Sequence, residues 1–505
     1  MNKILSFVFF SLILFNTIAI SANSEKYCTV IPQNFSKSES EENEELNQQE
    51  LFNTTRKGVV AIKVTAHLIL EKYVNEKLWH GTGFVVNTNP GLIVTNAHVA
   101  GEMAVCTYEV KFGNGKTVEA KLLYIDPLYD FAILSVDPKD IPIYVKPLKI
   151  SEESPIINSK IYAMGNSSKN EFSTYQGYIF DTESILWLKP FAEQSFQFSG
   201  LTVPGASGSP VFNTKGEVIG LLYGGKLVSG AALPISYVKP AIDKLKNGEN
   251  FHRYFYGAIL NYMPIQNAID SGNIPESIEN EYETCFPNSN NKILYVHKKL
   301  TAFNNENSQL DSGDIIWKVE DEIIGSNLKK IDQIVQEKAG KNLNITVYRK
   351  GKKINLEIPT FELDCSAKLK LLSFAGTTFF ETTPEVKVNF GKNNTAVYIT
   401  DSEAGSPFME ISNPSNGTYQ GGAFQITEIA GKKISTLDEL IDIIPDLFKK
   451  KVFDVKFIKL GSDSGEYSIT TKYFPEFVDA TLYTFNTSEN KWEVKSIKNP
   501  KQNNF

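Results

Sequence analysis

One loop of this chain carries the residue types that acyl transfer to a serine requires. Residues 205–210 read Gly-Ala-Ser-Gly-Ser-Pro, and the small residues around Ser207 let backbone N–H groups converge on one point. A serine hydroxyl attacks a carbonyl group only when a base removes its proton and nearby donors stabilise the oxyanion that forms. The loop therefore predicts a nucleophile, Ser207, and an oxyanion hole built by Gly205, Ala206 and Ser207.

A histidine and an aspartate earlier in the chain have the context of a catalytic base and its acid. His98 follows the apolar run 92–95, where a strand is expected to give way to a turn, and Asp130 directly precedes the apolar run 131–134. The chemistry needs a base that titrates near neutrality and an acid that fixes its tautomer, so we predict these roles for His98 and Asp130. Asp126 is the alternative acid, but a position before Pro127 is typical of a turn.

These motifs resemble those of secreted serine proteases of the HtrA/Deg family. The matching segments are Gly-Thr-Gly-Phe at 81–84, Thr-Asn-Ala-His-Val at 95–99, Asp-Phe-Ala-Ile-Leu at 130–134 and the loop that contains Ser207. The resemblance implies an ATP-independent endopeptidase that acts on misfolded or unfolded proteins in protein quality control and the stress response. It also implies a homo-oligomer, a trimer or a multiple of one. No cofactor is expected.

Two residues depart from the family pattern and leave other functions open. The family usually has asparagine where Ala206 stands and glycine where Ser209 stands. Neither change removes a backbone N–H, so we expect the oxyanion hole to persist. A collapsed loop would instead give a chaperone-like or peptide-binding protein with an idle protease domain. A serine at position 209 is also similar to bacterial glutamyl endopeptidases, so a secreted protease of that kind is a third hypothesis.

The elements that must position these residues are predicted to be short strands in two barrels. Closely spaced apolar runs separated by Gly, Asn and Pro turns favour antiparallel barrels. We expect a mainly β fold, in which a two-barrel chymotrypsin-like protease domain covers 56–247. The runs lie at 59–64, 83–86, 92–95, 104–112, 120–124, 132–136, 160–164, 175–180, 195–198, 211–212 and 218–223.

The rest of the chain resembles two PDZ-like α+β domains, expected over 248–365 and 366–475, with a C-terminal tail over 476–505. The first pattern of strands and one helix, 293–358, recurs at 397–458, which predicts an internal repeat of about 100 residues. PDZ domains bind an extended peptide by adding it as a strand. In the first domain Tyr256, Gly257, Ala258 and Ile259 are predicted to hold a peptide C-terminus. The loop 373–378 is the weaker candidate in the second.

The N-terminal residues predict an exported protein. Lys3 precedes the apolar run 4–20 and the small residues Ser21 and Ala22, a pattern typical of a cleavable signal peptide over 1–22. A retained membrane anchor is the alternative. We expect the periplasm as the location, or secretion. Residues 23–55 are expected to form a polar, acidic arm, and the net charge of −7 argues against a nucleic-acid partner.

The chain has four cysteines, Cys28, Cys106, Cys285 and Cys365. An even number in an exported chain favours disulfides, and we prefer the pairs Cys28–Cys106 and Cys285–Cys365. Free thiols are the alternative. No cysteine has a second cysteine or a histidine at the spacing of a metal site, so we expect no bound metal.

Overall fold

The computed structural model divides into two units, residues 1–48 and 49–505, and only the part of the chain from residue 39 onward is described. The described residues are 39–69, 78–101, 104–166, 171–186, 193–200, 204–226, 228–286, 291–300, 309–363, 369–392, 394–403, 405–412, 424–461, 464–475 and 478–499. The predicted signal peptide therefore lies outside them. Among the helices that the structure describes, none is long and apolar enough to cross a membrane.

The expected acidic arm is partly helical. Helix α1 (Glu39–Arg56) covers its second half. The segment contains no proline or glycine, and its glutamates are concentrated toward the N-terminal end, where negative charge stabilises the helix dipole. The high charge of this segment is thus compatible with a helix.

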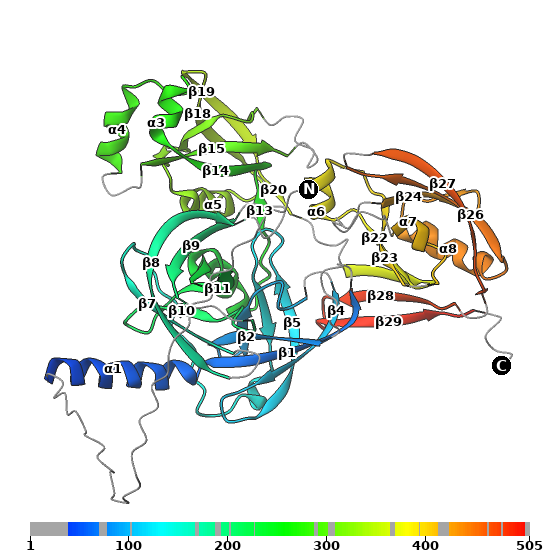
Figure 1. Ribbon diagram of the computed structural model, residues 1–505, viewed down its shortest axis with the longest axis horizontal. Coiled ribbons are helices and arrows are strands. Elements are labelled where there is room, and N and C mark those ends of the chain that lie inside the picture. The colour runs from blue at the N-terminus through cyan, green and yellow to red at the C-terminus, as the bar shows by residue number, and fades with distance from the viewer. Residues whose placement is uncertain are drawn as a thin grey trace, which may run out of the picture. The chain divides into compact units, whose positions relative to one another are not determined.

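Two closed antiparallel barrels of six strands each follow α1, as predicted (Figure 1). The strand orders are β1-β2-β3-β6-β5-β4 and β10-β11-β12-β9-β8-β7. The strands are β1 (Val59–Ile69), β2 (Leu78–Asn87), β3 (Leu92–Thr95), β4 (Ala104–Lys111), β5 (Thr117–Ile125) and β6 (Ala132–Ser135), then β7 (Lys160–Gly165), β8 (Ser173–Leu186), β9 (Glu193–Ser199), β10 (Pro210–Phe212), β11 (Val218–Lys226) and β12 (Ser229–Pro234). A 3-10 turn, η1 (Pro138–Asp140), lies between the barrels in sequence.

The alternation of residues along the strands explains why the barrels close around apolar cores. Val110 of β4 is paired with Val118 of β5 and both are buried, whereas the neighbouring pair Glu109 and Glu119 is exposed. Successive side chains of a strand point to opposite faces, so this pattern places valine inside and glutamate in solvent. The turn η2 (Ile235–Tyr237) and helix α2 (Lys239–Lys246) follow the second barrel.

The first PDZ-like module has the sheet order β14-β15-β16-β18-β19, with β17 paired to β16, and β13 pairs separately with β20. Helix α5 begins after Asn327, whose side chain caps it by accepting the N–H of Lys330. The elements are β13 (Tyr254–Phe255), β14 (Ala258–Pro264), α3 (Ile265–Asp270), α4 (Ile278–Cys285), β15 (Lys292–Lys299), β16 (Ile315–Val319), β17 (Glu322–Ile323), α5 (Leu328–Glu337), β18 (Asn342–Arg349), β19 (Lys352–Pro359) and β20 (Phe361–Glu362).

The second module repeats this strand order as β22-β23-β24-β26-β27, with β25 paired to β24, and then adds three strands beside β22. The elements are β21 (Lys370–Phe374), β22 (Thr377–Glu381), α6 (Pro384–Phe390), β23 (Val397–Ser402), α7 (Met409–Ser412), β24 (Phe424–Ile429), β25 (Lys432–Lys433), α8 (Leu437–Leu447), β26 (Val452–Lys459), β27 (Gly465–Lys472), β28 (Ala480–Asn486) and β29 (Lys491–Ile497).

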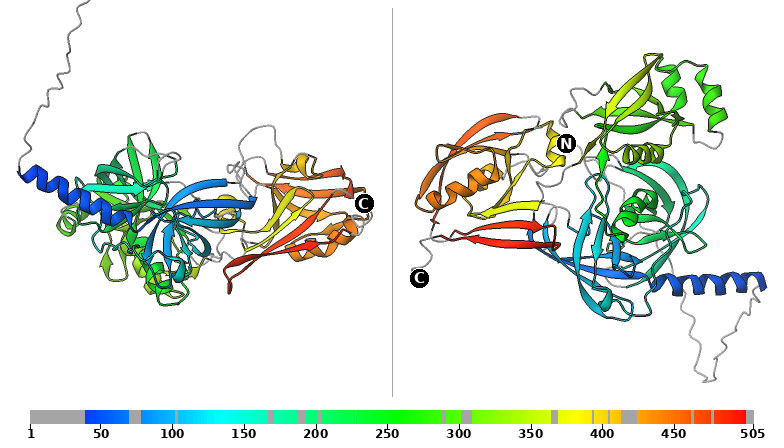
Figure 2. Two further views of the ribbon diagram at one scale, coloured as in Figure 1. Left: turned by 90° about the horizontal axis from the view of Figure 1, so that it is seen from below. Right: turned by 180° about the vertical axis from the view of Figure 1, so that it is seen from behind.

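The expected C-terminal tail is not a tail. Residues 480–497 form the hairpin β28–β29, seen in red in Figure 2, and β28 pairs with β21 over five residue pairs. The hairpin therefore extends the sheet of the second module. A polar turn between two alternating segments is the sequence signal that the prediction overlooked.

The two cysteines that the structure describes are both free thiols. Cys106 is buried in the core of the first barrel, and burial raises the pKa of its thiol to about 12. Cys285 is exposed at the end of α4. Neither expected disulfide is formed at these two residues, because each would need one of them; the intended partners Cys28 and Cys365 lie outside the described residues.

Candidate active site

The structure brings His98 and Asp130 into direct contact. His98 follows β3 and Asp130 precedes β6, and these strands pair with Thr95 opposite Ala132, so strand register alone brings the two loops together. Nδ1 of His98 lies 2.6 Å from Oδ2 of Asp130, and the backbone N–H of His98 donates to Oδ1 at 2.9 Å. The carboxylate is buried while the His98 side chain is 48% exposed. The Asp130 carboxylate is therefore fixed and buried, while the imidazole ring of His98 remains accessible.

The hydroxyl of Ser207 is held by a different acceptor. Its Oγ donates to the carbonyl oxygen of Tyr223 on β11 at 2.7 Å. The loop that carries it lies just before β10 and turns at Gly205 and Gly208, which have φ of +94° and +86°. These angles favour glycine, and a Cβ at Gly208 would lie 1.9 Å from the carbonyl oxygen of Thr82. In this conformation the proton of Ser207 points to Tyr223.

Ala206, the first departure from the family motif, is fully buried among the side chains of the second barrel's core. Its neighbours in that core include Ile161 and Val211. A methyl group suits this apolar environment, since a buried amide would need hydrogen-bond partners. The alanine is therefore accommodated by packing.

Asp126, the alternative acid, is committed elsewhere. Its Oδ1 accepts the backbone N–H groups of Leu128 and Tyr129, and its Oδ2 accepts the Tyr124 hydroxyl and Nε of Arg253. A carboxylate in this position shapes the loop that ends at Asp130. Geometry thus favours Asp130 over Asp126 as the partner of His98.

Arg253, which the sequence did not single out, joins the protease loop to the first PDZ-like module. Its side chain is fully buried. Nη1 lies 3.3 Å from Oδ1 of Asp332 on α5, and Nη2 donates to the carbonyl oxygen of Tyr237. Its guanidinium carbon lies 4.9 Å from the ring centre of Tyr129. One cation therefore holds two buried carboxylates, Asp126 and Asp332.

Burial and charge act in opposite directions on this cluster. Burial raises the pKa of Asp332, and the positive charge of Arg253 offsets part of that rise. Burial alone would lower the pKa of Arg253, but Asp126 and Asp332 hold it above its ordinary value. Burial also raises the pKa of Tyr129, which therefore remains a neutral hydrogen-bond donor.

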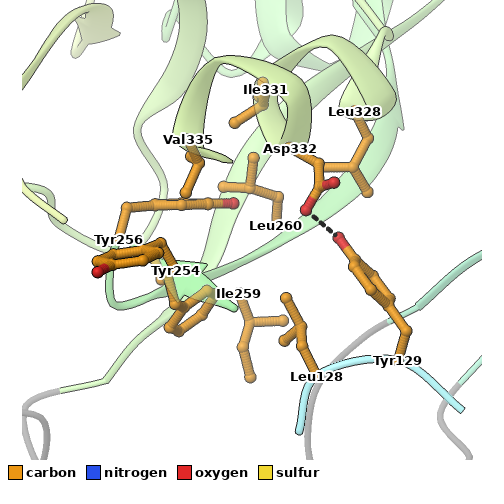
Figure 3. A pocket seen from close by; sticks show the side chains of 12 residues that line it. Leu128, Tyr129, Tyr254, Tyr256, Ile259, Leu260, Leu328, Ile331, Asp332 and Val335 are labelled. Carbon is orange, nitrogen blue, oxygen red and sulfur yellow. Dashed lines mark hydrogen bonds between the residues drawn. The ribbon is translucent and has the colours of Figure 1, made fainter. Parts of the chain in front are cut away.

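The predicted peptide groove lies between β14 and α5, and residues of the protease loop close it. Tyr256, Ala258 and Ile259, which are predicted to hold a peptide, line this pocket, and Gly257, at φ +78°, lies at the turn before β14. Leu128 and Tyr129 face α5 from the other side, and the Tyr129 hydroxyl donates to Asp332 at 2.9 Å (Figure 3). The remaining cavity is about 30 Å³. A peptide side chain needs more room than this.

No group of three or more His, Cys, Asp or Glu side chains in the described part of the chain is arranged to hold a metal ion. The chemistry that this arrangement offers is instead an acid–base pair beside a serine loop. A carboxylate orients an imidazole, the imidazole is accessible, and a hydroxyl lies in a glycine-rich turn. These are the groups that acyl transfer to serine uses.

The fold and this site define a trypsin-like serine protease with a PDZ module. Residues 81–221 match the trypsin-like peptidase domain family, and residues 287–360 match the PDZ domain family. The pro-apoptotic serine protease NMA111 of Meyerozyma guilliermondii is 24% identical over 461 residues, which are 89% of this chain and 45% of that protein. The protein of the same name from Pyricularia oryzae is 27% identical over 378 residues, 72% of this chain and 35% of its own length.

The chain spans less than half the length of these curated relatives. Among solved structures, the HtrA-type protease AlgW with tripeptide is 18% identical, with 62% of this chain and 96% of that chain covered and a TM-score of 0.46. The two matched domains and the named relatives place the chain among serine endopeptidases. The pairing of a trypsin-like peptidase domain with a PDZ domain is the one that the resemblance to HtrA/Deg proteases implies.

Proposed function

We propose that this chain hydrolyses peptide bonds with Ser207 as nucleophile, His98 as general base and then acid, and Asp130 as the group that orients His98. The observation that carries the proposal is the two-point contact of the Asp130 carboxylate with Nδ1 and the backbone N–H of His98. This contact fixes the proton on Nδ1, so that Nε2 is the nitrogen that accepts a proton from a serine.

The reaction begins when the Ser207 hydroxyl rotates from the carbonyl oxygen of Tyr223 to Nε2 of His98. His98 takes the proton as Ser207 attacks the substrate carbonyl, and the N–H groups of Gly205 and Ser207 stabilise the oxyanion. Asp130 stabilises the imidazolium that forms. His98 then gives the proton to the leaving amine, and water releases the acyl group by the same steps in reverse order. No cofactor takes part in this scheme.

The substrates we propose are segments of misfolded or unfolded proteins, cleaved without ATP. The family motifs support this substrate class, and the matched PDZ domain supports the binding of peptide C-termini beside β14. We also propose a homo-oligomer and export, the latter from the apolar run 4–20. The fungal relatives lend no support to a periplasmic location, so the proposal is limited to export.

The direct test is labelling by a fluorophosphonate together with hydrolysis of an unfolded protein. We expect one adduct, on Ser207, and complete loss of both labelling and hydrolysis in Ser207→Ala with the fold retained. Ser468→Ala, which changes an exposed serine of β27, is the matched control and keeps full activity. Substantial hydrolysis by purified Ser207→Ala would show that the nucleophile is misassigned.

A peptide-binding protein with an idle protease domain is the second candidate, and one observation favours it. The Ser207 hydroxyl is bonded to Tyr223, so a chain that never releases this bond would bind peptides without cutting them. Folded protein that takes no fluorophosphonate label yet binds peptides supports this candidate. A peptide-library digest tests the third hypothesis, a secreted glutamyl-endopeptidase-like protease. Cleavage strictly after glutamate would support it.

A further inference from the structure

Three successive carbonyl groups of the Ser207 loop each accept a hydrogen bond that fixes their direction. The donors belong to Thr82 of the first barrel and to Ser209 at the end of the loop. The carbonyl oxygen of Gly205 accepts the hydroxyl of Thr82 at 2.9 Å. That of Ala206 accepts the hydroxyl of Ser209 at 2.5 Å and its N–H at 3.0 Å. That of Ser207 accepts the backbone N–H of Thr82 at 2.8 Å.

The direction of a carbonyl group determines the direction of the next N–H. A trans peptide is planar, so the N–H of residue i+1 points opposite to the carbonyl of residue i. The Ser209 hydroxyl, by holding the carbonyl of Ala206, aims the N–H of Ser207 the other way. The Thr82 hydroxyl holds the Gly205–Ala206 peptide, which lies between the N–H groups of Gly205 and Ser207, and so fixes the backbone that joins these two donors. We propose that Thr82 and Ser209 are positioning residues that aim the backbone donors of the oxyanion hole.

Thr82 has one proton to give, and its surroundings assign that proton to Gly205. Its Oγ1 accepts the backbone N–H of Asn166 at 2.8 Å, a contact in which the hydroxyl can act only as acceptor. The proton must therefore go to the carbonyl oxygen of Gly205. Thr82 is fully buried, and its own carbonyl oxygen accepts the hydroxyl of Thr95 at 2.7 Å. The first barrel thus fixes a peptide that precedes strand β10 of the second barrel.

Ser209, the second departure from the family motif, has a matching residue that makes room for it. A Cβ at Gly165 would lie 1.8 Å from Oγ of Ser209 and 3.1 Å from Oγ1 of Thr82. The glycine therefore leaves space for both hydroxyls behind the loop. Ser209 is itself fully buried, so its hydroxyl has no water to bond in place of the Ala206 carbonyl.

This inference rests on the proposed endopeptidase function, and its test separates the two. Thr82→Val and Ser209→Ala remove one hydroxyl each with little change in shape, and Thr82→Ser keeps the hydroxyl. We expect kcat to fall about tenfold to hundredfold in the first two variants, with KM nearly unchanged, because the oxyanion donors act mainly on the transition state. Thr82→Ser is expected to keep kcat within about threefold of wild type. The matched control is Thr107→Val, an exposed threonine of β4 in the same barrel.

A second readout does not depend on activity. Hydrogen–deuterium exchange of peptides that cover 204–212 is expected to be faster in Thr82→Val and Ser209→Ala than in wild type, Thr82→Ser or Thr107→Val. Wild-type kcat in both hydroxyl-deletion variants overturns the inference, as does an equal loss of kcat in Thr107→Val. If the wild-type protein proves inactive, the endopeptidase proposal fails, and unchanged exchange in this segment then overturns the positioning role as well.

Discussion

The orientation of Asp130 is fixed by hydrogen bonds at its side chain and at its backbone. Oδ1 and Oδ2 both bind His98, and the side-chain amide of Asn96 donates to the backbone carbonyl oxygen of Asp130 at 2.9 Å. The carboxylate and the backbone behind it are therefore both fixed. The position of this acid leaves His98 one tautomer that suits the chemistry.

Asp130→Asn is expected to lower kcat by about four orders of magnitude while leaving the fold intact. An asparagine occupies the same volume, but its NH₂ group can face Nδ1 of His98 and so place the ring proton on Nε2. The measurement is steady-state hydrolysis, with circular dichroism as the check on folding. Asp126→Asn serves as the comparison, because it should lower stability and not kcat. If Asp126→Asn lowers kcat more than Asp130→Asn does, Asp126 and not Asp130 is the acid that orients His98.

Cys106 is expected to resist alkylation in the native protein. Burial raises its pKa to about 12, and reaction needs both a thiolate and access. Native protein treated with iodoacetamide at pH 8 should carry the label on Cys285, which is exposed, and take it on Cys106 only after unfolding. Mass spectrometry of the digested protein measures both sites. Prompt native labelling of Cys106 contradicts the buried position.

At the scale of elements, loop 126–130, strand β13 and helix α5 meet at one buried cation, Arg253. Removing one partner of a buried ion pair leaves an uncompensated charge, which is strongly destabilising. We expect Arg253→Met to lower the free energy of unfolding by about 3–5 kcal/mol. Lys63→Met, which breaks an exposed pair with Glu109, should cost about 0–1 kcal/mol. Urea unfolding followed by tryptophan fluorescence gives both values.

The penalty of Arg253→Met should depend on pH in a definite direction. Burial raises the pKa of Asp332 in the folded state, so its contribution to stability is complete at low pH and is lost as pH rises through that pKa. Tyr129 and Arg253 donate hydrogen bonds to Asp332, and the nearby Asp126 carboxylate raises its pKa further. Without Arg253 the rise in pKa is larger, and the destabilisation should therefore be greater at pH 7.5 than at pH 4.5. Equal losses at the two values contradict this account.

The elements that local sequence determines were the ones that could be predicted. Alternating residues and turn signals gave the barrels and the loops of His98, Asp130 and Ser207. Burial of Arg253 could not be predicted, because its partners Asp126 and Asp332 lie 127 and 79 residues away in the chain. Local composition misled the prediction at residues 39–55 and 480–497, where a charged segment folds as a helix and an expected tail completes a sheet. Both segments carry local signals that the prediction overlooked: the first lacks proline and glycine, and the second has a polar turn between two alternating runs.

At the scale of the whole molecule, the two PDZ-like modules differ in their capacity to accept a strand. Strand β14 pairs with β15 alone among the described strands, whereas β22 lies between β23 and β21. The hairpin β28–β29 then continues the sheet beyond β21. A peptide can add only where a strand edge is unpaired. The second module's corresponding edge is already occupied by its own chain.

We therefore expect one bound peptide per chain, which enters the groove when Tyr129 and its loop move away from α5. Calorimetric titration with a peptide that ends in an apolar residue should give a stoichiometry of one. Leu328→Glu, at the start of α5 in the groove, should weaken binding about tenfold to hundredfold through lost apolar contact. Ile441→Glu, a partly buried residue on α8 of the second module, is the matched control and should leave affinity unchanged. A stoichiometry of two contradicts the blocked edge.

Tyr129 closes the groove and is the immediate sequence neighbour of Asp130. A ligand that separates the Tyr129 ring from α5 also displaces the backbone that joins Tyr129 to Asp130. Linkage requires such an influence to run both ways with equal strength. A substrate mimic bound at the active site must then change the affinity of the groove for a peptide C-terminus by a certain factor. The bound peptide must change the affinity of the active site for the mimic by the same factor.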